Sequence, residues 1–473
     1  MNKTPYDVNI GLEIHARLKT RSKLFCRCEN RFDAEPNTLT CPICLGLPGA
    51  LPVLNKKAIE FAIKLGLACN CSISEITHFD RKNYFYPDLP KGFQITQYEN
   101  PICRNGFLVV SGRKIKIQQI HLEEDAGKSI HTNRVTLLDF NRCGVPLVEI
   151  VTEPIFSNPD EVIEFLLHLK RLLQYLDISD GNMEEGSLRC DANISLKPKS
   201  FSEMGEKVEV KNMNSFKSVK KALEYEIVRQ TLLLNEHRNI NQETRYWSQE
   251  QRRTFLMRRK EDTPDYRYFP EPDLPALKID TELIDACRSE MPESPDDRFR
   301  RFRSEYGLTS ENAELLTRDK LIADYFEAVN SHVEDSDLVC RWIVNEVFRI
   351  LKHNTRDILS NKLNARRLAE FICQVKTKNI SPNQAKSVFD QLLSDRQVKS
   401  ILSDVESKNK TDQISMVLDK IINDNSREWR RLIQGEKKLL NFFIGRVIRK
   451  LPGYIDPVQV RSELSRRVDK EKS

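Results

Sequence analysis

The first patterned stretch of the chain, residues 8–18, reads VNIGLEIHARL, in which apolar and mostly polar side chains alternate. A period of two residues predicts a β-strand. One face of this strand is expected to be buried, through the apolar residues Ile10, Leu12, Ile14 and Leu18. Glu13 and His15 then lie side by side on the opposite face, where a carboxylate and an imidazole can hold a cation. An ordinary surface strand shows the same alternation, so the strand alone leaves both interpretations open.

Length and composition predict about three domains. The 473 residues exceed the roughly 150 that are typical of one domain. The hydrophobic fraction is 39% and the charged fraction 30%, and no apolar run approaches the roughly 20 residues that span a bilayer. The first residues lack an apolar signal segment, so we expect a cytoplasmic protein without a membrane segment. In that reducing compartment the twelve cysteines are expected to be thiols or metal ligands.

Strand and helix patterns divide the sequence into an α+β part and an all-α part. Over residues 1–290, alternating stretches and turns mix with amphipathic helices that begin near Asn158 and Ser215, which predicts an α+β domain. Residues 263–275 hold too many prolines for a helix or a central strand and are expected to form an ordered loop. Helical spacing then dominates, which predicts a helical domain at 291–405 and a small helical tail at 406–473.

The net charge of +6 is concentrated at the carboxyl end of the chain. From Arg427 onward there are 13 Lys and Arg against 6 Asp and Glu, so this segment carries +7 and the rest of the chain −1. A basic segment suggests a polyanionic partner, and a solvated helix face is the competing explanation. A second basic group surrounds the proline-rich stretch and consists of Arg252, Arg253, Arg258, Arg259 and Lys260.

Four cysteines are spaced as metal ligands. They form a C-x-C pair and a C-P-x-C pair twelve residues apart: Cys26, Cys28, Cys41 and Cys44. Two such pairs can close a tetrahedral zinc site, whereas four buried thiols are the alternative. Because all four ligands would come from protein, this zinc is expected to hold a loop and not to activate water. Cys69 and Cys71 follow a helix-like stretch and are interpreted as packing residues.

Acidic residues gather where a cation would explain them. Glu123, Glu124 and Asp125 are consecutive, and like charges that close are tolerated mainly beside a cation or a lysine. Glu149 lies in the apolar run LVEIV, where an unpaired carboxylate is costly. Two further groups cover residues 80–88 and 183–191. Carboxylates with one imidazole and no cysteine favour Mg²⁺, which usually bridges to phosphates and so implies a nucleotide. For any single acid, a buried salt bridge remains the simpler explanation.

One apparent phosphate-binding motif is rejected. Residues 126–129, AGKS, resemble the end of a P-loop, but Leu122 stands where that motif requires glycine. Three acids also precede it, where backbone amides would have to meet phosphate. No dinucleotide-binding fingerprint, nucleophile elbow or H-E-x-x-H motif occurs in the sequence.

Several of these stretches together resemble one family, the B subunits of the aspartyl/glutamyl-tRNA amidotransferases. The matching sequence segments are Ile10–His15, Asp80–Pro87, His121–Lys128, Glu184–Ser195 and Asp265–Pro275. The segment from Asn423 to Phe443 also resembles the small helical tail domain of this family. The resemblance covers nearly the whole chain. It implies a cradle-shaped domain with a mixed, mostly antiparallel sheet, followed by a helical domain and a tail that reaches tRNA.

The resemblance also implies an activity and partners. Enzymes of this family are heterotrimeric ligases that form a carbon–nitrogen bond with glutamine as amide donor. They convert glutamate on tRNA(Gln), or aspartate on tRNA(Asn), into the amide, and the B subunit is their ATP- and Mg²⁺-dependent kinase. The chain lacks a Gly-Ser-rich amidase loop, so ammonia is expected from an amidase A subunit, with a small C subunit completing the complex.

Carried over position by position, the resemblance assigns a site. The metal ligands that it implies are Glu13, His15, Glu124 and Glu149. Asp191 and Lys128 are candidates for nucleotide binding, with Asp191 also a weaker candidate for the metal. Lys82 matches a lysine that lines the ammonia route of the family and can also meet developing phosphate charge. The cysteine group occurs in only some members of the family, so the zinc prediction depends on these residues alone.

Glu124 raises a conflict with the strand pattern. If Ile120 and Leu122 face the core, Glu124 faces it too, and only His121, Glu123 and Asp125 face the site. Glu124 is kept because the family match points to it, on the expectation that it lies in the turn before Gly127.

Two other functions stay open at this point. A non-catalytic, zinc-stapled RNA-binding scaffold would explain the tail and the cysteines, but it leaves Glu149 and the Glu13–His15 pair unexplained. A Mg²⁺-dependent nuclease would cleave tRNA with metal alone. Trp429 or Phe442 could stack on a base, although core packing is the more common role of an aromatic residue on a helical stripe.

Overall fold

The chain forms two compact units, Met1–Arg298 and Phe299–Ser473. A computed structural model describes residues 5–200, 203–259, 265–351, 358–377, 380, 382–451 and 457–472. The first unit is α+β and the second is helical, so the predicted fold class is confirmed. The division into three domains at residues 290 and 405 stays a prediction.

A twelve-stranded sheet organises the first unit. Its strands are β1 (Tyr6–Arg17), β2 (Ser72–Ile73), β4 (Asp80–Asn83), β5 (Phe93–Thr96), β6 (Cys103–Val110), β7 (Arg113–Glu124), β10 (Pro146–Thr152), β11 (Leu188–Pro198), β12 (Val208–Lys211), β13 (Glu243–Ser248), β14 (Arg253–Arg259) and β15 (Phe269–Pro270). Their order is β14-β13-β12-β11-β1-β10-β7-β5-β4-β15, and β6 pairs with β7 and β2. Only β12 and β13 run parallel; the other pairs are antiparallel.

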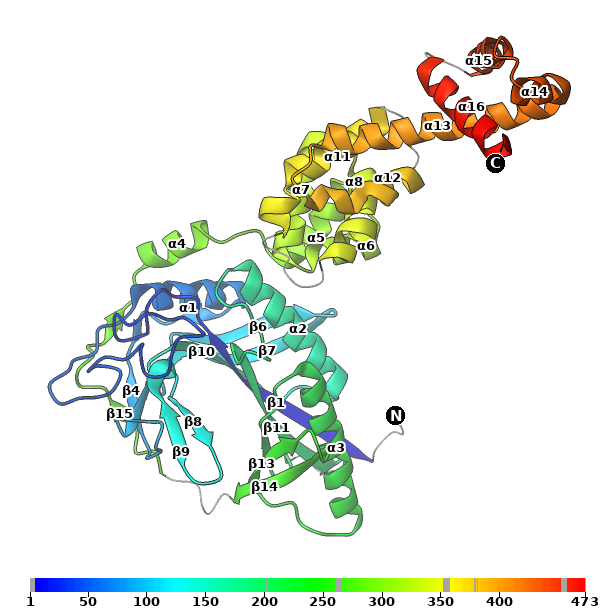
Figure 1. Ribbon diagram of the computed structural model, residues 1–473. Coiled ribbons are helices and arrows are strands. Elements are labelled where there is room, and N and C mark those ends of the chain that lie inside the picture. Colours follow the sequence, from blue (N-terminus) through cyan, green and yellow to red (C-terminus); the bar gives the residue numbers. More distant parts are fainter. Residues whose placement is uncertain are drawn as a thin grey trace. The chain divides into compact units, whose positions relative to one another are not determined.

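Helices α1 (Lys56–Ala68), α2 (Pro159–Tyr175) and α3 (Phe216–Asn235) pack against one face of this sheet (Figure 1). The helices of the unit are α1 (Lys56–Ala68), α2 (Pro159–Tyr175), α3 (Phe216–Asn235), α4 (Thr281–Ser289) and the short 3₁₀ turn η1 (Phe140–Arg142). The side chain of Asn158 caps α2 and that of Ser215 caps α3, each accepting a backbone N–H three residues ahead. Both predicted helix starts are therefore confirmed.

Strand β1 lies at the centre of the sheet and has the predicted alternation. Ile10, Leu12 and Ile14 are 0–1% exposed and belong to the core between the sheet and its helices. Leu18, just beyond the strand, is buried as well. Each such apolar side chain contributes about 1.5–3 kcal/mol on burial. The alternate residues of β1, including Glu13 and His15, are only half buried and lie on the face that α1–α3 leave free.

Two small sheets and the proline-rich stretch complete the first unit. The small sheets pair β3 (Ile76–Thr77) with β16 (Leu277–Lys278) and β8 (Lys128–His131) with β9 (Thr136–Asp139). The described part of the proline-rich stretch is ordered, as predicted. The carboxylate of Glu271 accepts two 2.7 Å hydrogen bonds from Arg81, and the rings of Tyr98 and Tyr268 stack 3.9 Å apart.

The second unit consists of helices. From Pro295 onward the elements are α5 (Pro295–Ser304), α6 (Ser310–Thr317), α7 (Lys320–Val333), α8 (Ser336–Trp342), the π-helical η3 (Ile343–Val347), α9 (Phe348–Ile350), the π-helical η4 (Ile358–Lys362), α11 (Ala365–Thr377), α12 (Pro382–Phe389), η5 (Asp390–Leu393), α13 (Val398–Asp424), α14 (Ser426–Ile433), α15 (Leu439–Lys450) and α16 (Pro457–Lys472). One core of the unit contains the ring of Trp342, which stacks on Phe389 and meets Phe371 edge-on.

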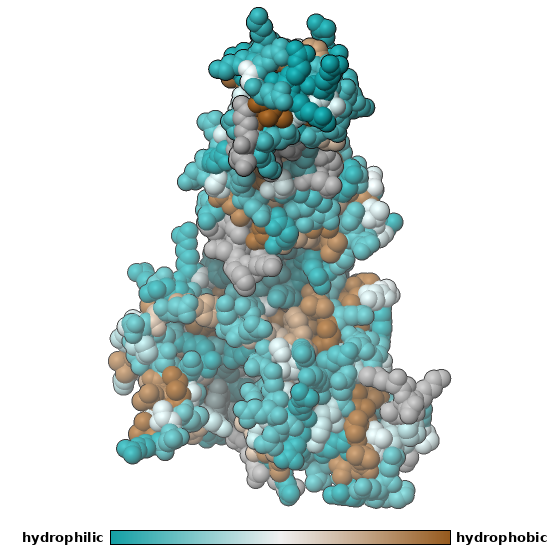
Figure 2. All heavy atoms as spheres, turned by 45° about the vertical axis from the view of Figure 1, so that its right-hand side comes forward, coloured by the Kyte–Doolittle hydropathy of each residue, from teal (hydrophilic) through white to brown (hydrophobic). Residues whose placement is uncertain are grey.

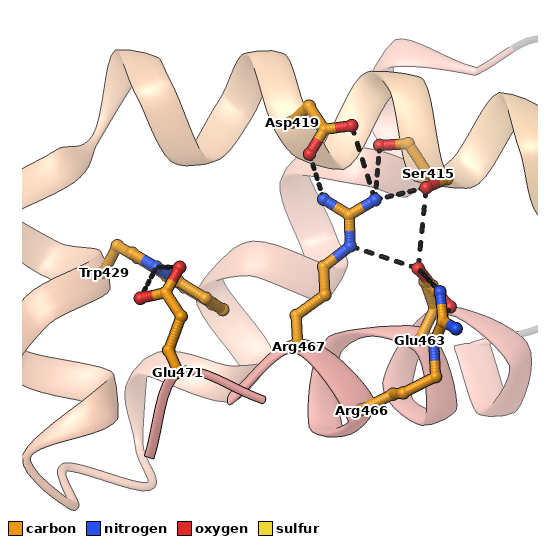
Figure 3. A network of polar contacts seen from close by, with 7 residues as sticks. All are labelled: Ser415, Asp419, Trp429, Glu463, Arg466, Arg467 and Glu471. Atoms are coloured by element: carbon orange, nitrogen blue, oxygen red, sulfur yellow. Dashed lines mark hydrogen bonds and ion pairs between the residues drawn. The ribbon is translucent and has the colours of Figure 1, made fainter. Parts of the chain in front are cut away.

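A separate core lies among α13, α14, α15 and α16. Trp429 packs edge-on against Phe443 there, and its Nε1 donates to the carboxylate of Glu471. Arg467 of α16 reaches Asp419 and Ser415 of α13, and it also bonds Glu463 one helical turn earlier (Figure 3). Trp429 is therefore a packing residue, the more common of the two predicted roles.

The face drawn in Figure 2 is mostly hydrophilic, with apolar residues in separate small groups. Among the helices that the structure describes, none has the length and apolar character needed to cross a membrane.

Candidate metal and nucleotide site

Three neighbouring strands bring one imidazole and two carboxylates together on the free face of the sheet. His15 of β1 pairs across with Glu149 of β10, and Glu149 pairs with His121 of β7. Directly opposed residues point to the same face. Nε2 of His15 lies 3.3 Å from a carboxylate oxygen of Glu123 and 3.6 Å from one of Glu149. We call His15, Glu123 and Glu149 the acid cluster.

The acid cluster has the donor set of a divalent cation site. Its ligand atoms all lie within 4.8 Å of one another, and adjacent donors around Mg²⁺ at 2.0–2.1 Å are about 3 Å apart. Nε2 of His121 lies 3.0 Å from a carboxylate oxygen of Glu149, so His121 borders the site and can donate a hydrogen bond to this carboxylate. Two carboxylate oxygens with imidazole nitrogen suit Mg²⁺ or Mn²⁺. The residues present therefore fit the predicted ion.

Charges within the acid cluster shift its ionisation. Burial lowers the pKa of His15, but the carboxylates of Glu149 and Glu123 raise it by more, and the pKa lies well above its ordinary value. Burial raises the pKa of Glu149, but His15 and His121 lower it by more, and the pKa lies well below its ordinary value. Without a bound metal ion, attraction between the imidazole and the two carboxylates holds the cluster together. To ligate a divalent cation, His15 must be a neutral imidazole, so a bound ion would displace its proton.

Glu13 borders the acid cluster without joining its tightest group. Its carboxylate accepts a 2.8 Å hydrogen bond from Asn193 of β11, while burial and repulsion from Glu149 raise its pKa. Asp191, opposite Glu13 on β11, is bound 2.5 Å from Nζ of Lys211, which also pairs with Glu209. The two predicted acids are therefore neighbours of the cluster, and Asp191 already has a cation.

The expected placement of Glu124 beside His15 is corrected by the structure. Glu124 points to the other side of β7, where its carboxylate pairs with Lys91 and accepts the backbone N–H of Ile95 at 2.9 Å. The reason is strand parity: Glu124 continues the series of Ile120 and Leu122, both fully buried. Glu123 takes the place beside His15.

A cavity of about 610 Å³ opens next to the acid cluster. It is lined by the predicted nucleotide-binding candidates Lys128 and Asp191. Arg189, the cross-strand partner of His15, also lines it. This volume is typical of cavities that hold small ligands.

Two guanidinium groups of this cavity share the carboxylate of Asp125, and the guanidinium of Arg17 lies in its field. Asp125, 8% exposed in its side chain, lies 2.5 Å from Arg189 and 3.5 Å from Arg142. Burial lowers the pKa of Arg17, the charges of Asp125 and Asp180 oppose this, and the charges of Arg142 and Arg189 lower the pKa further. The lining as a whole holds five cationic and five acidic side chains. Attraction for an anionic ligand would therefore come locally from the guanidinium groups and not from a net positive lining.

Lys82, on β4, lies among aromatic rings. Its Nζ is 4.9 Å from the ring centroid of Tyr266 and 5.9 Å from that of Tyr84. Burial raises the pKa of Glu123, but His15 lowers it by more. Lys82 lowers it weakly as well, and the pKa lies below its ordinary value. Lys82 is therefore close enough to the acid cluster to contribute to its field.

The four predicted cysteines converge. Their sulfur atoms lie within 4.8 Å of one another, and those of Cys41 and Cys44 are 3.8 Å apart. Zinc bound tetrahedrally at 2.3 Å sets its sulfurs about 3.8 Å apart, so this group could hold a metal such as zinc. Cys69 and Cys71 lie outside it; Cys69 is buried in the core and Cys71 packs beside it, as interpreted.

The basic residues predicted to contact RNA are only partly placed. Arg253, Arg258 and Arg259 belong to β14, the edge strand at one end of the sheet. Arg252 lies in the turn before it with a positive φ. Lys260 falls outside the described residues. Phe442 is half buried beneath Arg446, whose guanidinium lies 4.7 Å from the ring.

Several residues of the site escaped sequence reasoning. His121 and Glu123 could have been chosen by parity, which already conflicted with Glu124. Arg189 and Asn193 carried no local signal, because their place beside β1 follows from a pairing between strands about 180 residues apart. Lys211 reaches the site from β12, which pairs with β11.

Comparison with known protein families covers most of the sequence. A family model described as GatB/GatE catalytic domain matches residues 8–285, which include the acid cluster and the cysteine group. A second model, described as GatB domain, matches residues 324–468. The chain belongs to the GatB family. The resemblance predicted from the sequence motifs is confirmed.

Individual GatB relatives align with the chain from end to end. A protein of Thermodesulfovibrio yellowstonii is 44% identical over 474 residues, covering 98% of this chain and 100% of the relative. One of Carboxydothermus hydrogenoformans is 43% identical, with 98% and 99% covered. One of Myxococcus xanthus is 43% identical, with 97% and 98% covered. Each is named as the B subunit of an aspartyl/glutamyl-tRNA(Asn/Gln) amidotransferase.

Proposed function

We propose that the chain is the B subunit of a tRNA-dependent amidotransferase. In this proposal it phosphorylates the side-chain carboxylate of misacylated Glu-tRNA(Gln), Asp-tRNA(Asn) or both, with ATP as phosphoryl donor. The acid cluster carries the proposal, together with the nearby 610 Å³ cavity, which is lined by Arg189, the cross-strand partner of His15. The names of the GatB relatives support the same reaction class.

The reaction needs phosphorylation because oxide is too poor a leaving group for ammonia to displace. A carboxylate oxygen of the aminoacyl group attacks the γ-phosphorus of ATP, the bond to the bridging oxygen breaks, and ADP leaves. Ammonia then attacks the acyl carbon, and phosphate leaves to give the amide. Both reactants of the first step are anions, so the site must offset their repulsion.

His15, Glu123 and Glu149 would hold the cation that this step requires, with Glu13 as the next candidate. When bound, Mg²⁺ supplies positive charge to the phosphoryl oxygens. His121 orients Glu149 from the side by a 3.0 Å contact. Glu124, kept in the ligand set by the family match, is set aside here because its carboxylate is committed to Lys91.

The cavity would take the nucleotide. Arg17, Arg142 and Arg189 line it, and guanidinium groups bind phosphate in a bidentate manner. Lys128 lies on the same wall. These residues hold the phosphates beside the acid cluster, because Arg189 is the cross-strand neighbour of His15.

Lys82 would act on the second half of the reaction. Its ammonium group lies against the faces of Tyr266 and Tyr84, an environment that also attracts ammonium ions. It can guide ammonia toward the acyl phosphate or stabilise the leaving phosphate. The ammonia itself would come from an amidase A subunit, with a small C subunit in the same complex.

ATP turnover in the assembled complex tests this function. We expect ATP hydrolysis by the chain with its amidase and third subunits to be stimulated by misacylated tRNA. His15→Ala should reduce kcat about 100-fold or more, since the bound ion is worth several kcal/mol, while tRNA binding persists. His131→Ala is the control, because that exposed imidazole lies 3.0 Å from the hydroxyl of Thr136 on the small β8–β9 sheet and is not part of the acid cluster.

Unchanged ATP turnover in His15→Ala, with tRNA still bound, would contradict the kinase assignment and favour the RNA-binding scaffold. Cleavage of tRNA with metal in the absence of ATP would favour a nuclease.

A further inference from the structure

A fully buried lysine lies beside the four-cysteine group. The side chain of Lys23 is 0% exposed. Its Nζ donates a 2.7 Å hydrogen bond to the carbonyl oxygen of Leu39 and a 3.7 Å hydrogen bond to Sγ of Cys44. Among the residues that the structure describes, no carboxylate forms an ion pair with it.

This burial needs a counter-charge. An ammonium group removed from water is strongly destabilising unless a negative charge lies close to it. The carbonyl of Leu39 provides only a dipole, and a protonated cysteine provides little more. Glu124, whose carboxylate lies on the same side of Gly144, is already paired with Lys91. The missing negative charge must come from the sulfur atoms.

A zinc ion bound by four thiolates supplies that charge. Each cysteine ligand binds as an anion, so one Zn²⁺ with four thiolates carries a net charge of −2. The backbone fixes Lys23 at this group, since its N–H donates to the carbonyl of Cys28 at 3.0 Å. Sγ of Cys44 accepts from Lys23 and also from the N–H of Cys41, at 3.1 Å. Two donors converging on one sulfur suit a thiolate.

We propose that Lys23 is a positioning residue for a zinc centre formed by Cys26, Cys28, Cys41 and Cys44. Its fixed positive charge stabilises the metal-bound thiolates, and these thiolates compensate for its burial. Hydrogen-bonding partners around metal ligands typically change metal affinity 10- to 100-fold. Lys23 thus sets how firmly the cysteine loop retains its metal, separately from the chemistry at His15.

Competition with a chelator tests the proposal on the full-length chain loaded with zinc. Lys23→Met should raise the dissociation constant of zinc about 10- to 100-fold. Lys19→Met is the matched control, because Lys19 is exposed and pairs with Asp177 at 2.8 Å. Its zinc affinity should equal that of the wild type. If Lys23→Met does not fold, Lys23→Gln keeps a donor for Leu39 and removes the charge, with the same expected loss.

Thermal unfolding with and without zinc separates this role from plain packing. With zinc bound, Lys23→Met should melt at a lower temperature than the wild type. With zinc removed, it should melt at a higher temperature, because the wild type then buries an uncompensated charge. Equal zinc affinity in both chains, a lower melting temperature in both states, or a wild-type chain that binds no zinc would each overturn the proposal.

Discussion

The role of each residue on β7 depends on the side of the strand to which its side chain points. His121 and Glu123 alternate with Ile120 and Leu122 along β7, so the polar pair reaches the acid cluster while the apolar pair enters the core. Glu124 follows Leu122 by two positions and shares its side. Adjacent glutamates in the sequence thus have separate environments, one against His15 and the other against Lys91.

Neighbouring substitutions can distinguish these two glutamates. Glu123→Gln removes a carboxylate from the acid cluster, so we expect the Mg²⁺ concentration that gives half-maximal ATP turnover to rise by about tenfold or more. Glu124→Gln should leave this Mg²⁺ requirement within about twofold of wild type. Steady-state turnover at a series of Mg²⁺ concentrations measures both. A raised requirement in Glu124→Gln alone would restore the ligand set implied by the family match.

The Lys91–Glu124 pair predicts a large coupling in stability. Both side chains are at most 10% exposed. Lys91→Met leaves the buried carboxylate of Glu124 without its counter-charge and should lower the free energy of unfolding by about 3–5 kcal/mol. The double variant Lys91→Met/Glu124→Gln should recover most of this loss, because neither charge is then buried alone.

Urea denaturation of the two single variants and the double variant completes this cycle. Additive losses, with no recovery in the double variant, would mean that the two groups do not compensate each other.

Part of the site was predictable from single residues. Glu13 and His15 followed from alternation in one strand, and the cysteine group followed from its spacing. Residues on other strands needed the register of the sheet. Arg189 faces His15 only because β11 pairs antiparallel with β1, and nothing local in the sequence fixes that register.

At the scale of elements, helix starts were predicted better than helix interruptions. Asn158 and Ser215 cap helices through their own side chains, a signal that the sequence carries directly. The π-helical segment at Ile343–Val347 has no such signal, since it depends on packing within the helical core.

Arginine contacts between α13 and α16 give a prediction at this scale (Figure 3). Arg467 is 17% exposed and joins Asp419, Ser415 and Glu463, whereas Arg466 is 76% exposed and reaches only Glu463. Arg467→Met should therefore release α16, lowering the local free energy of opening by about 1–3 kcal/mol. Arg466→Met should change it by less than about 0.5 kcal/mol.

Hydrogen exchange of the α16 amides measures this opening in both variants. Equal protection in Arg466→Met and Arg467→Met would show that apolar packing alone holds the helix.

On the scale of the whole chain, fold class followed from composition and periodicity, since strand alternation gives way to helical spacing after about residue 290. The unit boundary near Arg298 lies close to that change. The tail charge of +7 is a separate property that neither core explains. Within the described chain, several of its basic residues, including Arg430, Lys437 and Lys438, are exposed and form no ion pair.

Salt dependence of tRNA binding tests whether this charge meets RNA. Replacing Arg430, Lys437 and Lys438 by Gln should weaken binding and reduce the slope of log K against log salt by about 2 to 3. ATP turnover at saturating tRNA should not change. The control replaces Lys207, Lys217 and Lys278, exposed lysines of the first unit, by Gln. An unchanged slope in the tail variant would identify this surface as an ordinary solvated face.

The central claim is that His15, Glu123 and Glu149 together hold a divalent cation beside a nucleotide cavity. Anomalous diffraction from crystals of the complex soaked in Mn²⁺ and a non-hydrolysable ATP analogue tests it most directly. The account predicts a manganese peak within coordinating distance of all three side chains, and no such peak in Glu149→Gln. A nucleotide-bound structure without manganese at these residues, or with manganese at Glu124 instead, would contradict it.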